Sequence, residues 1–130
     1  MQRKIFYWLP PLIWMGVIFY FSSYPKVSIT QNSLFAFIIF KSLHVIEYGI
    51  LYFLLFRAFY SLEKMKLNFR YKVIFTFLAA IFYALSDEIH QTFIPTREGR
   101  LRDVFIDTAG MVLMYIYIKS NLVKLKKFLL

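Results

Sequence analysis

The sequence contains no cysteine, which excludes disulfide bonds and any chemistry that needs a thiolate. Glycine is scarce, with 4 in 130 residues, and these form no phosphate-cradling loop and no G-x-S-x-G motif. We therefore expect no nucleotide-binding site. Acidic residues are few as well, since 7 Asp and Glu stand against 16 Lys and Arg, for a formal net charge of +9.

Apolar residues dominate what is present. They make up 60% of the chain, in runs that are too long for the core of a soluble domain of this size. A helix that crosses a hydrocarbon core of about 30 Å needs about 20 residues. Four segments have this character, at about residues 5–21, 35–60, 72–92 and 103–118. The sequence thus predicts an all-α, multi-pass protein of the cell membrane, folded over residues 1–130 as one four-transmembrane-helix bundle.

The distribution of basic residues predicts the orientation of this bundle. In a soluble protein the positive charge would suggest nucleic acid, but here it clusters between and after apolar segments, so we expect no nucleic-acid partner. The richer side is taken as cytoplasmic, which puts both termini inside. That side carries Arg3, Lys4, Arg57, Lys64, Lys66, Arg70, Lys72, Lys119, Lys124, Lys126 and Lys127, and the other carries Lys26, Lys41, Arg97, Arg100 and Arg102.

Most polar residues are predicted to lie in one layer, the outer half of the membrane. Residues 86–107 carry five of the seven acids, and a rise of about 1.5 Å per residue from the cytoplasmic basic anchors brings polar groups of all four segments to similar depths. Residues three, four and seven apart share a helix face, and such stripes are expected to surround an outward-opening cavity because they must avoid lipid. The stripes are Lys41, His44, Tyr48 and Tyr52, with Glu47 at the margin; Tyr83, Asp87, His90 and Gln91, with Glu88 pointing elsewhere; and Asp103, Asp107, Gly110 and Met114.

Catalysis and metal binding are both compatible with these residue types. Asp87 and His90, at i and i+3, are expected to form a couple in which the acid orients the ring for acid or base catalysis. Asp103, Asp107 and His44 would supply a second acid or base. The same five residues offer nitrogen and oxygen ligands that suit a divalent metal, although no H-E-x-x-H spacing fixes such a site. The alternative is structural, with cations neutralising the acids in interhelical ion pairs.

A second group of residues suits an anionic headgroup. Arginine forks match phosphate or carboxylate oxygens, and arginines in an outward loop oppose the usual charge rule. Their alternative role is contact with lipid headgroups or with neighbouring acids. Ser22 and Ser23 either bond to a helix end or supply a nucleophile. The predicted substrate-binding set is Lys41, Glu47, Tyr48, Gln91, Arg97, Arg100, Ser22 and Ser23.

Three polar motifs run in order through nearly the whole chain. They are Phe21-Ser22-Ser23-Tyr24-Pro25, then Lys41-x-x-His44-x-x-Glu47-Tyr48, then Asp87-Glu88-x-His90-Gln91-x-Phe93-x-Pro95-x-Arg97, followed by Asp103 and Gly110. Together they resemble the VanZ-like family. Asp107 departs from the family pattern, in which asparagine is common at this position, and so adds charge to the site. The resemblance implies a small multi-pass bacterial membrane protein whose founding relative is associated with resistance to the lipoglycopeptide teicoplanin.

Two functional hypotheses follow. In the first, the protein is an intramembrane hydrolase or transferase that acts on an anionic lipid or a lipid-linked precursor of the cell envelope. In the second, it is a non-catalytic resistance module that binds a lipid or a lipoglycopeptide. A proton or ion path fits less well, because the polar residues stop in the outer half of the membrane. Membrane lipids are the expected partners, and the pattern specifies no cofactor beyond the divalent metal option and no oligomeric state.

Overall fold

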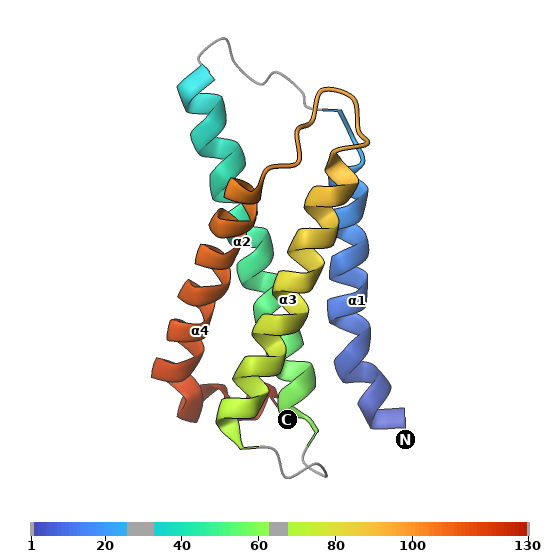
Figure 1. Ribbon diagram of the computed structural model, residues 1–130. Helices are drawn as coiled ribbons and strands as arrows, with labels where there is room; N and C mark the ends of the chain where they lie inside the picture. The colour runs from blue at the N-terminus through green and yellow to red at the C-terminus, as the bar shows by residue number, and fades with distance from the viewer. Residues whose placement is uncertain (1, 26–32, 63–67, 130) are drawn as a thin grey trace.

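The computed structural model describes residues 2–25, 33–62 and 68–129, and within these ranges all regular structure is helical. The helices are α1 (Gln2–Ser22), α2 (Ser33–Tyr60), α3 (Phe69–Gln91) and α4 (Leu101–Leu129). They pack as one bundle (Figure 1). The predicted all-α, four-helix fold is confirmed. Three basic residues of the orientation argument, Lys26, Lys64 and Lys66, lie outside the described residues.

The core lies along α2, which packs against each of the other three helices. Tyr48, Tyr52 and Phe56 are fully buried on one face of it. Ala80 of α3 and Met111 of α4 meet this face, also fully buried. Many large apolar side chains point away from the bundle instead, which is the arrangement expected where lipid replaces water as the surrounding solvent.

A glycine permits the closest approach of α2 and α4. A Cβ at Gly110 would collide with the backbone carbonyl oxygen of Val45, and Gly49, one turn further along α2, also packs against the Gly110 backbone. Small residues allow such contact between helices in a membrane, where packing and hydrogen bonds drive association. The contact at Gly110 therefore fixes the spacing of the two helices that carry most of the polar stripes.

Three helices are long and apolar enough to span a membrane, by length and composition: α1 over Ile5–Ser22, α2 over Leu34–Tyr60 and α3 over Phe69–Gln91. Of the four predicted membrane spans, these three are therefore supported. α4 is not among them. Its first two turns carry Arg102, Asp103 and Asp107, and lysines recur after Ile118. These polar residues lower the hydropathy of a helix that the bundle nevertheless includes.

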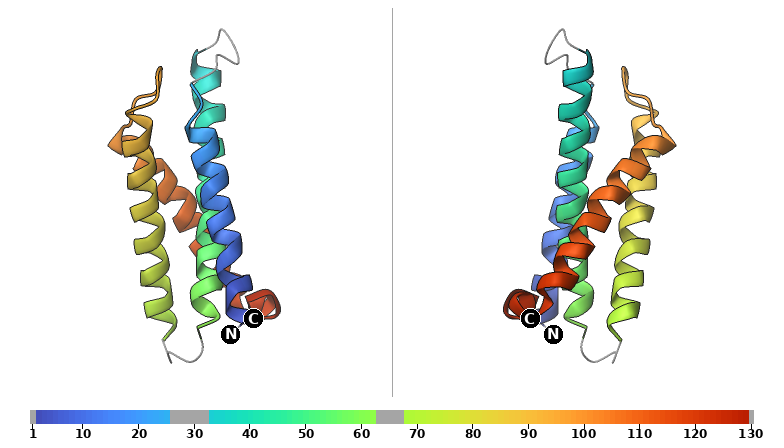
Figure 2. Two further views of the ribbon diagram at one scale, coloured as in Figure 1. Left: turned by 90° about the vertical axis from the view of Figure 1, so that its right-hand side faces the viewer. Right: turned by 90° about the vertical axis from the view of Figure 1, so that its left-hand side faces the viewer.

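α4 is also longer than the predicted 103–118. It has a kink at Asn121, where φ is −116° and ψ is 15°. The part beyond this kink turns across the end of the bundle (Figures 1 and 2). Leu122 and Leu125 pack against the core, Leu129 is fully buried, and the three lysines between Leu122 and Leu129 are exposed. The lysines that follow Ile118 predict the end of the span there, whereas leucines at three- and four-residue spacing continue the helix as an amphipathic segment.

The two ends of the described chain lie at the same end of the bundle (Figure 1), as two outward and two return helices require. The Arg57 Nε donates to the Phe128 backbone carbonyl at 2.7 Å, which fastens the C-terminal segment to the end of α2. That this end faces the cytoplasm stays a prediction from the positions of the basic residues.

Candidate functional site

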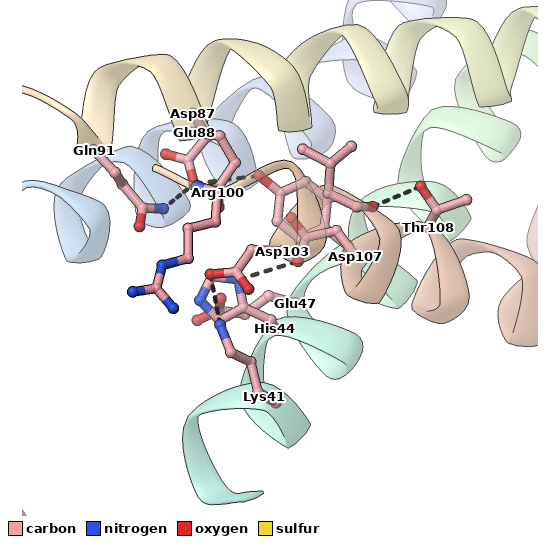
Figure 3. A network of polar contacts seen from close by, with 12 residues as sticks. Lys41, His44, Glu47, Asp87, Glu88, Gln91, Arg100, Asp103, Asp107 and Thr108 are labelled. Carbon is pink, nitrogen blue, oxygen red and sulfur yellow. Dashed lines mark hydrogen bonds and ion pairs between the residues drawn. The ribbon is translucent and has the colours of Figure 1, made fainter. Parts of the chain in front are cut away.

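Two polar pairs join α2 to α4 (Figure 3). The Lys41 Nζ lies 2.6 Å from the Asp103 Oδ2, and the His44 Nδ1 lies 3.1 Å from the Asp107 Oδ1. Residues 41 and 44 share one face of α2, as 103 and 107 share one face of α4. Since the pairs follow in the same order along both helices, α2 and α4 run parallel. Two of the three predicted polar stripes therefore face each other.

The α3 stripe joins the same cluster through Asp87. Its Oδ2 accepts hydrogen bonds from the Tyr48 hydroxyl at 3.3 Å and from the Gln91 Nε2 at 2.9 Å. The Asp87 side chain is buried, as is Tyr48. Glu47 is half-buried and lies beside His44 in Figure 3. Polar side chains from three helices thus meet within the bundle, as the stripes predicted.

The predicted couple of Asp87 and His90 does not form, and this expectation was wrong. The His90 Nε2 lies 3.0 Å from the Ser23 Oγ, and its ring stacks on Phe19 with centroids 4.4 Å apart. Positions three apart on a helix differ by about 60° in direction. That angle suffices here, because α3 has both α1 and α2 as neighbours, so that Asp87 faces α2 and His90 faces α1. Within the described residues, the acid–imidazole couple is instead Asp107 with His44.

The serines that end α1 lie on that other side of α3. Ser22 is buried, and the Ser23 hydroxyl donates to the Phe19 backbone carbonyl at 2.7 Å. Because this hydroxyl hydrogen is committed to a carbonyl, the His90 Nε2 must donate the proton of the bond with Ser23. An activated nucleophile needs the reverse direction, with histidine accepting. Ser23 therefore has the geometry of a helix-end cap.

Glu88 points away from the polar stripe to which Asp87 belongs, as its position on the helix predicts. Its side chain is buried, and its Oε2 accepts the backbone N–H of Arg100 at 2.9 Å, just before α4 begins. Adjacent residues on a helix differ in direction by about 100°, which turns Glu88 toward α4 where Asp87 faces α2. A carboxylate beside the first residues of a later helix is a common partner for its free N–H groups. That signal was present in the sequence, but the pairing depends on the fold.

A cavity of about 280 Å³ opens above the His44–Asp107 couple, between α2, the start of α4 and the loop that precedes it. Four cationic side chains and two acidic ones are among the residues that line it. Asp107, Asp87, Tyr48 and Glu47 do not line it, nor do Ser22, Ser23 and His90 on the α1 side. Its lining residues are Phe37, Phe40, Lys41, His44, Gln91, Thr96, Arg97, Glu98, Arg100, Arg102 and Asp103.

The cations on this wall have different partners. Arg100 pairs with Glu98, and the Arg102 Nε lies 3.6 Å from the Asp103 Oδ1. Arg97 was predicted to bind substrate, but its guanidinium is largely committed elsewhere. Its Nε and Nη2 donate to the carbonyls of Tyr24 and Phe21, at 2.7 and 3.0 Å, and so cap the end of α1. Its Nη1 reaches the Gln91 Oε1 at 3.4 Å.

The same motifs that pointed to a family at the sequence level supply this site. A family model described as VanZ/LLP1 matches residues 7–124. The chain belongs to the VanZ/LLP1 family. No curated protein and no solved structure matches it. Together with its three membrane-length apolar helices, this membership identifies a VanZ-like membrane protein, and the match includes the cation-lined cavity and the couple beneath it.

The buried acids of this VanZ/LLP1 protein are incompletely satisfied. Among the described residues, one oxygen of each of four carboxylates is buried without a hydrogen-bond partner: Asp87 Oδ1, Glu88 Oε1, Asp103 Oδ1 and Asp107 Oδ2. Such atoms suggest a metal. Yet in the part of the chain that the structure describes, no three His, Cys, Asp or Glu side chains lie close enough together to hold an ion. The residues present therefore do not fit the divalent metal option in this arrangement.

Proposed function

We propose that this VanZ/LLP1 protein binds the anionic headgroup of a membrane lipid or of a lipid-linked envelope precursor in the cation-lined cavity, and that His44 transfers protons during hydrolysis or group transfer there. One observation carries this proposal. His44 is the cavity residue whose ring is held by a fully buried acid, Asp107, while cations surround the space in front of it.

The cavity suits a phosphate-bearing headgroup in size and charge. Its volume of about 280 Å³ lies just below the range of about 300–1,000 Å³ for ligand pockets, so it accommodates a headgroup rather than a whole lipid. Lys41, Arg100 and Arg102 line it, and the two arginines offer the forked N–H pattern that matches phosphate oxygens. A bound headgroup would replace Glu98 as the partner of Arg100, or Asp103 as the partner of Lys41 and Arg102.

The chemistry assigned to His44 follows from its bond to Asp107. With Asp107 ionised and the imidazole neutral, the carboxylate only accepts hydrogen bonds, so the Nδ1 carries the proton and the Nε2 keeps a free lone pair. The acid thereby fixes the tautomer that can act as a base. The Nε2 takes the proton of an attacking water or acceptor hydroxyl as a new bond to phosphorus forms. It then returns that proton to the departing oxygen as the original phosphoester bond breaks.

The experiment is a turnover assay with purified protein in lipid nanodiscs, using phosphatidic acid, phosphatidylglycerol and a polyprenyl phosphate as probes. His44→Ala should lower the rate of headgroup release by about 10²–10⁴-fold, the usual contribution of a positioned acid or base. Asp107→Asn should lower it less. His90→Ala is the matched control, because that ring lies at Ser23 outside the cavity and its loss should leave turnover unchanged. Equal turnover in the His44 and His90 variants would refute the catalytic assignment.

A non-catalytic module that binds a lipid or lipoglycopeptide is the second candidate. The observation in its favour is that Phe37 and Phe40 lie on the cavity wall beside the cations, which suits a ligand with an apolar tail next to an anionic group. In that case Lys41→Met and Arg102→Met should weaken ligand binding, His44→Ala should not, and no probe should be turned over. Binding by isothermal titration in the same nanodiscs separates the two functions.

A further inference from the structure

A second, smaller cavity lies between α3 and α4, on the other side of Arg100 from the headgroup cavity. It measures about 150 Å³, and apolar side chains form most of its wall: Leu85, Ile89, Leu101 and Val104. Ile89 is 63% exposed and Leu101 72% exposed, so this α3–α4 groove opens toward the surface that faces lipid. Its place beside the bilayer makes an acyl chain its natural occupant.

Glu88 is the polar exception in the α3–α4 groove. It lines the groove and is only 5% exposed, and its Oε1 has no hydrogen-bond partner among the described residues. Its other oxygen is already used by the Arg100 backbone N–H. A buried carboxylate oxygen without a donor is costly in an apolar surrounding. A purely apolar occupant would leave the Glu88 Oε1 without a hydrogen bond, whereas a ligand with a hydrogen-bond donor beside its chain would supply one.

Continuity with the headgroup cavity favours the same kind of ligand. Arg100 lines both spaces, so a molecule whose chain lies along Leu85 and Ile89 has its polar end at Glu88, next to the cations of the larger cavity. Lipids have this order of parts: an acyl chain, then hydroxyl or ammonium donors near a phosphate. A water-soluble phosphate ester has nothing to place in the groove.

We infer that the α3–α4 groove binds the acyl chain of a lipid whose headgroup carries a hydroxyl or ammonium donor for Glu88, and that it is the lateral entrance to the headgroup cavity. This deepens the proposed function and rests on it for the fate of the headgroup. It assigns the substrate class, a lipid resident in the bilayer that enters sideways between α3 and α4.

The first test measures lipid retention by native mass spectrometry of the detergent-purified protein. The probes are dioleoyl phosphatidylglycerol, with hydroxyl donors, dioleoyl phosphatidylethanolamine, with an ammonium, and dioleoyl phosphatidylcholine, which lacks a donor. Glu88→Gln should lower retention of the first two by about tenfold and leave the third unchanged, because hydrogen bonds and packing decide association in a membrane. The amide oxygen of glutamine can still accept the Arg100 N–H, so the fold should be kept. Equal retention of all three lipids by wild type and variant would overturn the inference.

The second variant fills the groove. Ile89→Trp should reduce retention of the donor lipids by about fivefold through lost packing. Phe82→Trp is its control, on the same helix and 75% exposed but outside the groove lining. Similar losses in both variants, or none in either, would refute a specific groove.

Turnover then separates this inference from the proposed function. If both hold, Ile89→Trp lowers turnover of dioleoyl phosphatidylglycerol, a donor lipid, and spares the short-chain, water-soluble dihexanoyl form. If His44→Ala has no effect on either substrate, the catalytic proposal fails, while the retention measurements still decide for or against the groove.

Discussion

The contact at Gly110 gives the sharpest prediction about what holds the site together. A Cβ added there would lie 2.9 Å from the carbonyl carbon of Val45 and 3.0 Å from its Cα, and closer still to the oxygen. Carbon atoms in contact prefer about 3.5–4.0 Å, so α2 and α4 must separate by about 0.5–1 Å in Gly110→Ala. The bond from His44 to Asp107 is 3.1 Å long, and this separation takes it to or beyond the limit of a hydrogen bond.

We expect Gly110→Ala to lower the free energy of unfolding by about 1–3 kcal/mol, the usual cost of overpacking. The measurement is unfolding in mixed micelles with increasing denaturing detergent, followed by circular dichroism. Gly16→Ala is the matched control, since a Cβ at Gly16 meets nothing within 4 Å. Turnover and headgroup binding should fall in the Gly110 variant alone. If the two variants unfold at the same detergent fraction as wild type, the close approach does not set the helix spacing.

Three further outcomes follow from individual contacts. Lys41→Met removes the cation that lies 2.6 Å from the largely buried Asp103 and should lower the free energy of unfolding by about 3 kcal/mol. The double variant with Asp103→Leu should recover most of this loss, and no recovery would contradict simple pairing. Arg97→Ala uncaps α1 and should cost about 1–3 kcal/mol in the same unfolding assay, yet weaken headgroup binding less than Arg100→Ala does; the reverse order would make Arg97 a ligand residue. Arg57→Ala should release the C-terminal segment, so that trypsin cuts its lysines faster while turnover stays the same, and unchanged cleavage would show that its leucines suffice to hold it.

The helices could be predicted from the sequence because bilayer thickness sets a length that apolar runs reveal directly. The first three predicted segments end within a residue or so of α1, α2 and α3. The end of α4 could not be found in this way. After Ile118 the pattern changes from a continuous apolar run to leucines spaced along one face, and only the end of the bundle shows what that face covers.

The site was predictable as a layer but not as a set of pairs. Lys41 and His44 share a face by spacing alone, and so do Asp103 and Asp107. Whether Asp87 or His90 faces α2 depends on how α3 is rotated between α1 and α2, and a change of about 60° exchanges one neighbour for another. The loop before α4 adds a second unknown. It contains Thr96 at a φ of 66°, a conformation that a β-branched residue seldom adopts and that local sequence rules do not predict.

The pattern of satisfied and unsatisfied oxygens favours a binding site over a set of structural ion pairs. Pairs that served only to join helices would match each buried acid with a cation, as Lys41 does for Asp103. Asp87 and Glu88 are instead held by neutral donors, a tyrosine hydroxyl, a glutamine amide and a backbone N–H, and no group in the described part of the chain donates to the other oxygen of either acid. Meanwhile the cations gather one layer further out, around the cavity. This separation of acids from cations agrees with the proposed ligand, which carries both a negative group and a donor.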